Sequence, residues 1–228
     1  MVAIEVKSPA VENPRRKRNP RGEGERLREE IIAGAAAVLG RTGSEEAVSL
    51  RAIAREVGIA APSISRHFAD RTEIIDEVIA RTQFHLHDSM YAAGRSTDDP
   101  VEQLQRIARA YLAFARDHPV QYRLLMSRRY VEDWETRSLT MPLTQPAMLA
   151  AIDAVVAVLQ ACIDTGASAS TDARADTLIM WGALHGLVTA PQAITSVDWP
   201  DDEQLVEACV TRMGRLVPPG AVERPGLG

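Results

Sequence analysis

Apolar residues recur at steps of three and four along most of this chain. Between Glu25 and Gly43, for example, Leu27, Ile31 and Val38 follow this spacing, which places them on one face of a helix. The same spacing returns in several later segments, and no useful length alternates with the period of two that marks a strand. The sequence therefore predicts an all-α protein, with about nine helices.

Capping and turn residues divide these helices. Ser49 is placed to cap a short helix that Gly58 ends, and Pro62 opens the next short segment. A longer helix is expected to begin at Asp70 or Thr72 and to run to Ala92. The turn-rich "GRSTDDP" follows it. Later helices are expected from Val101 to "RDHP", over 120–128, across 152–163, over 172–190 and over 200–217.

Charge and composition suggest four parts. These are a basic arm without fixed structure (1–21), a three-helix domain (22–71), a larger helical domain (72–217) and a flexible tail (218–228). Thirteen basic and ten acidic residues give 1–71 a net charge of +3, whereas 72–228 carry −8. A polyanion would be repelled by the second region and tolerated by the first, so 72–92 is expected to connect two functionally different domains.

The remaining composition excludes several classes of protein. With 46% hydrophobic and 25% charged residues the chain is globular in type. Its apolar runs stop well short of the roughly 20 residues of a membrane span. Because no apolar signal core is present at the N-terminus, we expect a cytoplasmic protein with no membrane partner. Cys162 and Cys209 lie far apart in apolar patterns, which favours buried thiols over a disulfide or metal site.

A helix-turn-helix pattern lies between Ala54 and Ile64. Ala54 is small enough to let two helices approach, Gly58 gives the turn its backbone freedom, and Ile64 is placed to fill the core from the second helix. Four further apolar residues complete the inner face of this pattern: Ile53, Val57, Ile59 and Phe68.

Residues 26–79 resemble the N-terminal domain of the TetR family of bacterial transcriptional repressors. The resemblance rests on "SLRAIAREVGIAAPSISRHF" at 49–68 and on "ADRTEII" at 69–75. Beyond Pro100, "FARDHPVQYRLLM" and "WGALHG" resemble the C-terminal domain of one branch of that family. The resemblance implies a homodimer that binds a palindromic duplex operator and responds to a small-molecule effector.

Four positions depart from the family pattern. Ser65 stands where a phosphate-contacting tyrosine is usual, and Ala60 and Ala61 replace a capping hydroxyl residue and a lysine. Arg71 replaces the usual lysine and keeps its charge. The recognition helix therefore has fewer polar contacts than its relatives, and its specificity is expected to depend on Arg66, the basic arm and DNA shape.

The DNA-binding residues are assigned from this pattern. Ala61, Pro62, Ser65 and Arg66 are expected to face the major groove, with Arg66 bidentate to a guanine and Ala61 and Pro62 against thymine methyl groups. Ser49, Ser63, His67 and Arg71 are expected to contact phosphates. The arm is expected to lie in a minor groove through Arg15, Arg16, Lys17 and Arg18.

The larger domain is expected to hold a dimer interface and a pocket. The segment 172–190 is apolar on nearly every side, which favours a helix covered by its own core and by a partner subunit. With 200–217 it predicts a four-helix interface that contains Leu184, Leu187, Val188, Leu205, Cys209 and Met213. A mainly apolar effector is expected against Tyr111, Phe114, Met126, Trp134, Met148, Trp181 and His185.

Two other functions were weighed. An enzyme would have to use five dispersed histidines, and His85 and His87 point in divergent directions on a helix. Because no phosphate loop, nucleophile motif or metalloprotease motif is present, we expect no catalytic residues, no metal and no cofactor. A helix-turn-helix module for protein contacts alone is the second alternative, and the basic arm disfavours it.

Overall fold

The computed structural model describes residues 24–127 and 144–218. These residues form nine α-helices, and their only β pairing is an isolated bridge between Ser168 and Leu216. They fall into two compact units that divide inside α4, between Val78 and Ile79. The expected all-α class is confirmed. The division lies beyond the expected boundary at 71, because Ile74, Ile75 and Val78 of α4 are buried with the N-terminal unit.

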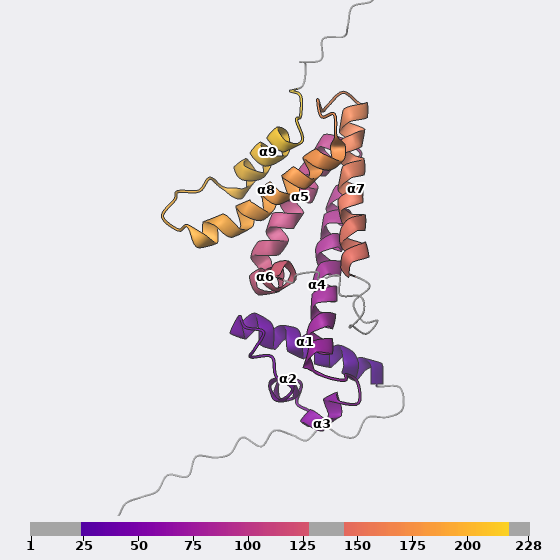
Figure 1. Ribbon diagram of the computed structural model, residues 1–228, viewed down its shortest axis with the longest axis vertical. Helices are drawn as coiled ribbons and strands as arrows, with labels where there is room; N and C mark the ends of the chain where they lie inside the picture. The colour runs from indigo at the N-terminus through magenta and orange to yellow at the C-terminus, as the bar shows by residue number, and fades with distance from the viewer. Residues whose placement is uncertain (1–23, 128–143, 219–228) are drawn as a thin grey trace, which may run out of the picture. The chain divides into compact units, whose positions relative to one another are not determined.

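The N-terminal unit contains three helices and the start of a fourth: α1 (Gly24–Thr42), α2 (Leu50–Val57), α3 (Ala61–Ile64) and the first turns of α4 (Arg71–Gly94). The helices α1 and α2 pack closely (Figure 1). A Cβ atom on Gly34 would come 2.5 Å from the Cγ2 of Val57, so a larger residue there would force Val57 to shift. Val38, Ile53, Ile64 and Phe68 fill the core between these helices.

The turn between α2 and α3 follows the sequence pattern. Ser49 caps α2, its hydroxyl oxygen accepting a hydrogen bond from the Ala52 amide at 3.1 Å. Gly58 ends α2 in the left-handed region at φ 72°, where a residue with a Cβ would be strained. The α3 helix has only four residues, with no side-chain cap at Ala60 and a proline in its first turn. Its position therefore depends on Ile64 and Phe68, which are buried.

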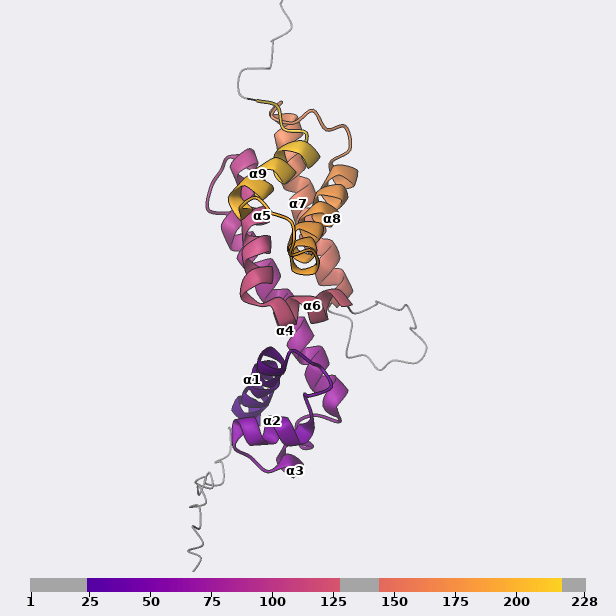
Figure 2. The ribbon, with the colours of Figure 1, turned by 90° about the vertical axis from the view of Figure 1, so that its left-hand side faces the viewer.

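The C-terminal unit is built around α5 (Pro100–Asp117). Helix α5 contacts four helices: α6 (Pro119–Ser127), α7 (Thr144–Asp164), α8 (Ala173–Ala193) and α9 (Asp202–Met213). Figure 1 shows α8 lying between α7 and α9, and Figure 2 shows the same three helices after a quarter turn; both neighbours pack against α8. No helix in the described residues combines the length and apolar character needed to cross a membrane.

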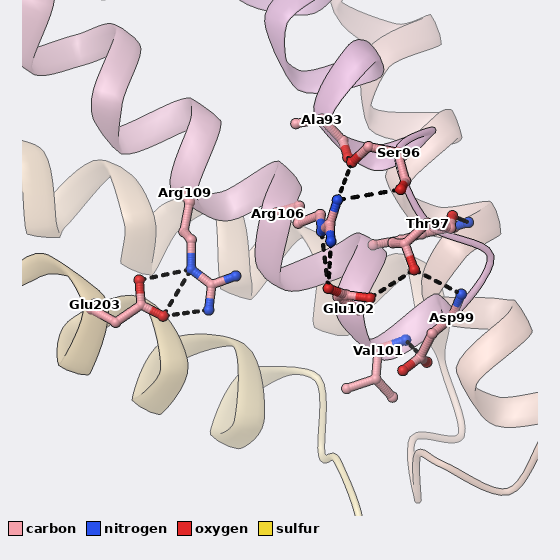
Figure 3. A network of polar contacts seen from close by, with 10 residues as sticks. Ala93, Ser96, Thr97, Asp99, Val101, Glu102, Arg106, Arg109 and Glu203 are labelled. Carbon is pink, nitrogen blue, oxygen red and sulfur yellow. Dashed lines mark hydrogen bonds and ion pairs between the residues drawn. The ribbon is translucent and has the colours of Figure 1, made fainter.

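Polar contacts hold α5 at its N-terminus and farther along its length (Figure 3). Asp99 caps the helix by accepting from the Val101 amide at 3.0 Å, and the Thr97 hydroxyl donates to Glu102 at 2.7 Å. Beyond them, the Nε of Arg109 donates to the Glu203 carboxylate at 2.8 Å and joins α5 to α9. The helix that contacts most of the unit is thus held in register with α9 and with the turn that follows α4.

Several helix ends differ from the expected ones, and α7 begins at Thr144 although the expected helix began at 152. Helix α8 continues past Pro191 to Ala193, because a proline in the last turn removes only one helical hydrogen bond and the Ile194 amide still donates to the Ala190 carbonyl at 2.8 Å. Helix α9 stops at Met213, short of 217. Its following residues turn back instead, with the Val217 amide donating to the Ala167 carbonyl at 2.9 Å.

Candidate functional site

The segment made of α3 and the turn after it presents one long cationic side chain. Pro62, Ser65 and Arg66 are exposed, whereas Ile64 at the end of α3 and Phe68 after the turn are buried with exposures of 0% and 3%. Ala61, Ser63 and His67 are half-buried beside them. The two buried side chains hold this segment against the core, and Arg66 lies on the exposed turn between them.

Three neighbouring arginines are already paired inside the N-terminal unit. Arg28 forms an ion pair with Glu77 and stacks over the Phe68 ring, with its Cζ 4.9 Å from the centroid. Arg41 pairs with Glu56 at 2.7 Å, and the hydrogen bond between them lowers the pKa of the Glu56 carboxyl. The third is Arg71. Within the described residues Arg66 has no such partner, so it is free to contact a polyanion.

Arg71 has a structural role that the sequence pattern did not reveal. Its Nε donates to the Val48 carbonyl at 2.7 Å, and its Nη2 donates to the Glu45 carbonyl. The side chain is 37% exposed and holds the segment that leads into α2. Arg71 thereby positions Ser49, which is exposed at the N-terminus of α2. The expected phosphate contact of Arg71 would have to use its remaining nitrogen, Nη1. The other expected DNA contacts, from Arg15 to Arg18, lie outside the described residues.

A cavity of about 60 Å³ lies in the C-terminal unit. Helices α4 to α8 all contribute to its wall, and among the described residues His87 is the only acidic or basic one that lines it. Four of the expected pocket residues line it: Tyr111, Met126, Met148 and Trp181. Phe114 is buried elsewhere against the His118 ring, with centroids 4.8 Å apart, and Trp134 lies outside the described residues.

A chain of hydrogen bonds runs from the cavity wall to α8. The hydroxyls of Tyr111 and Tyr122 are 2.6 Å apart, and the Tyr122 hydroxyl is 2.7 Å from Nδ1 of His185. Burial raises the pKa of both tyrosines, so both hydroxyls stay protonated. His185 therefore lies behind the wall, not in it. The sequence pattern did not predict a role for Tyr122. The one available signal was its position within "HPVQYRLLM", which resembles the C-terminal domain of the family.

A second hollow, a groove of about 510 Å³, lies along α4, α5 and α7. It shares five wall residues with the cavity: His87, Met90, Ile107, Ala151 and Val155. Phe84 and Tyr91 line the groove and are 67% and 58% exposed. Burial lowers the pKa of His87, which favours its neutral form between the two hollows.

The expected dimer residues do not share one surface. Leu184, Val188 and Cys209 are buried within the chain, and burial raises the pKa of the Cys209 thiol to about 11. The other three, Leu187, Leu205 and Met213, are half-buried. The reason for the difference is that α8 turns this face toward α9 and the cavity. Its exposed apolar face instead carries Leu178 and Ile179, with open space around Gly182 and Gly186.

Together these features define the class of protein. Two helices meeting at a left-handed glycine, an exposed arginine on the turn after the second of them, and a separate helical unit with an apolar cavity characterise a helix-turn-helix regulator. Residues 31–78 match the model for bacterial regulatory proteins of the tetR family, and residues 104–213 match that for the tetracyclin repressor-like C-terminal domain. The chain belongs to the TetR family and is a DNA-binding transcriptional regulator in fold.

Solved structures show the same fold. A protein of unknown function from Rhodococcus sp. RHA1 matches with a TM-score of 0.70 at 23% identity, covering 83% of this chain and 94% of that one. The TetR family transcriptional regulator PfmR from Thermus thermophilus matches with a TM-score of 0.58 at 18% identity, and the match covers 82% of this chain and 98% of PfmR. The ketosteroid transcriptional regulator KstR2 of Mycobacterium tuberculosis matches with a TM-score of 0.59 at 19% identity, and the match covers 82% of this chain and 93% of KstR2. No curated protein matches the chain significantly.

Proposed function

We propose that this protein is a cytoplasmic, non-enzymatic repressor that binds a palindromic operator as a homodimer and is released by a small, mainly apolar effector. The observation that carries the proposal is Arg66, which is exposed and has no partner within the described residues, on the turn after α3 that buried Ile64 and Phe68 hold in place. In this arrangement Arg66 reads a guanine in the major groove. Two copies read half-sites about 34 to 36 Å apart.

Selection of binding sites from a random duplex pool tests this role. Arg66→Ala is expected to lose preference at one base pair of each half-site, at a cost of about 1 to 3 kcal/mol of discrimination. Arg212→Ala removes the same charge from an exposed position on α9 and is the matched control. An Arg66→Ala selection profile identical to that of the wild type would contradict the groove assignment.

The homodimer is proposed to form through the exposed face of α8. Ile179 is 55% exposed, and a Cβ atom added to Gly182 or Gly186 would meet nothing within 4 Å. Glycines on an exposed helix face allow close approach of a second helix, and the neighbouring apolar side chains gain burial. Ile179→Asp is expected to sediment as a monomer, with exposed Leu149→Asp on α7 as control. A dimeric Ile179→Asp variant would exclude this face.

The effector is proposed to bind the cavity between α4 and α8. Support comes from its apolar wall and from the similarity in fold to a ketosteroid regulator. Helix α4 carries cavity residues Leu86 and Met90 and also begins in the N-terminal unit, so it is the element through which the effector acts. Because coupling is reciprocal, operator DNA must weaken effector binding by the same factor as the effector weakens operator binding. Independent binding in a titration would exclude the switch.

A further inference from the structure

We propose that the hydroxyl of Thr177 is the polar anchor for the effector, and that the effector is a neutral molecule with one hydrogen-bonding oxygen on an apolar body. This inference rests on the proposed function in one respect, which is that the cavity is the effector site. It goes beyond that function by assigning the anchoring residue and the charge of the ligand.

Thr177 differs from three other threonines that lie in or directly after helices. Thr42, Thr165 and Thr189 each donate a hydrogen bond to the carbonyl four residues earlier, at 2.8, 2.9 and 3.0 Å. Thr177 on α8 is only 3% exposed and lines the cavity, and its Oγ1 has no hydrogen-bond partner in the described parts of the chain. A buried hydroxyl without a partner is costly, and a ligand oxygen in the cavity removes that cost.

The other polar groups of the wall are less suitable anchors. The Tyr111 hydroxyl is already bound to Tyr122 at 2.6 Å, and Tyr122 in turn is bound to His185. His87 is shared with the outer groove, and its buried surroundings lower its pKa and favour the neutral imidazole. Among the described residues, Thr177 therefore supplies the fully buried oxygen of the wall that has no hydrogen-bond partner.

The same wall disfavours an ionised ligand. No aspartate, glutamate, lysine or arginine among the described residues lines the cavity, so a carboxylate or ammonium group would lose its hydration without gaining a counter-charge. A neutral hydroxyl or carbonyl needs only one hydrogen bond, which Thr177 supplies as donor or acceptor. The chemical class is thus a neutral alcohol, phenol or ketone.

The wall also adapts to the size of its ligand. At about 60 Å³ the cavity is small, but Met90, Met126, Met148 and Met180 line it. Methionine side chains are flexible and repack readily around an inserted group. Met90 also borders the larger groove of about 510 Å³. A change of the Met90 side-chain rotamer would therefore connect the cavity with the groove. A single six-membered ring is therefore a suitable probe.

Binding of phenol, toluene and benzoate to the full chain tests the proposal. The three probes share one ring but carry a neutral hydroxyl, a methyl group and an anion. At pH 7 we expect phenol to bind about tenfold more tightly than toluene, because one buried hydrogen bond is formed, and benzoate to bind more weakly than either. Calorimetric titration measures all three affinities.

Three variants locate the effect. Thr177→Val keeps the shape and removes the hydroxyl, so it should erase the preference for phenol, whereas Thr177→Ser should retain it. Thr189→Val, on an exposed position of the same helix, is the matched control and should behave as the wild type. Equal binding of phenol and toluene to the wild type, a preference surviving in Thr177→Val, or failure of every probe to bind would each overturn the proposal.

A second readout does not depend on any ligand. Because Thr177→Val removes an unpaired hydroxyl from an apolar site, the folded-to-unfolded ratio should rise by about fivefold, seen as a higher urea midpoint. A lower midpoint would show that the hydroxyl stabilises the fold, and the anchor role would be withdrawn. None of these measurements uses DNA. A negative result in the Arg66→Ala selection would therefore not affect the anchor proposal, and a negative result in the ligand titrations would not affect the proposed operator recognition.

Discussion

In the N-terminal unit the side chain proposed to read DNA is charged and exposed, whereas the polar side chains that line the cavity of the C-terminal unit are neutral. Arg66 lies exposed on the turn after α3, while Arg28, Arg41 and Arg71 are held by partners within the unit. Around the cavity, by contrast, the polar groups are buried hydroxyls and imidazoles. The two units therefore offer two different kinds of recognition within one chain.

The difference separates two kinds of energetics. An exposed cation gains affinity from a polyanion by releasing counterions, and this gain depends on salt. A buried hydroxyl contributes through a hydrogen bond in an apolar site, where salt does not enter. The two binding events should thus respond differently to the same change of conditions, even though α4 belongs to both units.

The largest expected effect is on operator affinity at different salt concentrations. For a site with about six phosphate contacts, affinity should fall roughly 10³-fold between 50 and 200 mM salt. Phenol affinity for the cavity should change by less than about twofold over the same range, because salt screens exposed charges and leaves a neutral buried contact unaffected. Fluorescence anisotropy with a labelled duplex and calorimetry with phenol measure the two. Operator affinity that is independent of salt would remove the contrast.

The second effect concerns the buried network. Tyr122→Phe removes the hydroxyl that joins Tyr111 to His185 and leaves both without this partner. The free energy of unfolding should fall by about 1 to 3 kcal/mol, because buried polar groups become unsatisfied. Urea unfolding measures the change.

An exposed tyrosine supplies the control for this network. Tyr91 is 58% exposed, and its hydroxyl accepts from Arg95 at 3.0 Å. Tyr91→Phe should change stability by less than about 0.5 kcal/mol, as is usual for surface substitutions. Equal effects of the two tyrosine variants would show that the Tyr111–Tyr122–His185 chain adds nothing to stability.

Local chemistry made the N-terminal unit predictable. A serine before an apolar run, a glycine after it and a proline just inside the next helix each act through neighbouring backbone atoms. Ser49, Gly58 and Pro62 lie where the pattern placed them. The helix-turn-helix, the all-α class and the order of the helices follow from such short-range signals.

Contacts between distant segments were not predictable in the same way. Arg71 and Val48 are bonded although 23 residues separate them, and Tyr122 and His185 although 63 do. Periodicity also shows that α8 is apolar all round but not which side meets its own core. For that reason Leu184 and Val188 were assigned to the interface, although they lie inside the chain.

The smallest expected effect distinguishes two roles of Arg71. Arg71→Met keeps the aliphatic stem but removes the donors to Val48 and Glu45. Since the side chain is 37% exposed, the loss of stability should be only about 1 kcal/mol. Binding to all duplexes should weaken together, because the segment that caps α2 loosens.

The salt dependence of this weakening identifies its cause. If Arg71 acts by holding the segment before Ser49, the variant should bind more weakly with an unchanged slope of log affinity against log salt. Loss of a direct phosphate contact would instead reduce the slope by about one. Arg66→Met, which breaks no bond within the described residues, should leave the unfolding midpoint unchanged. A reduced slope with full stability for Arg71→Met would return Arg71 to the phosphate-contacting residues and leave α2 positioned by Ser49 alone.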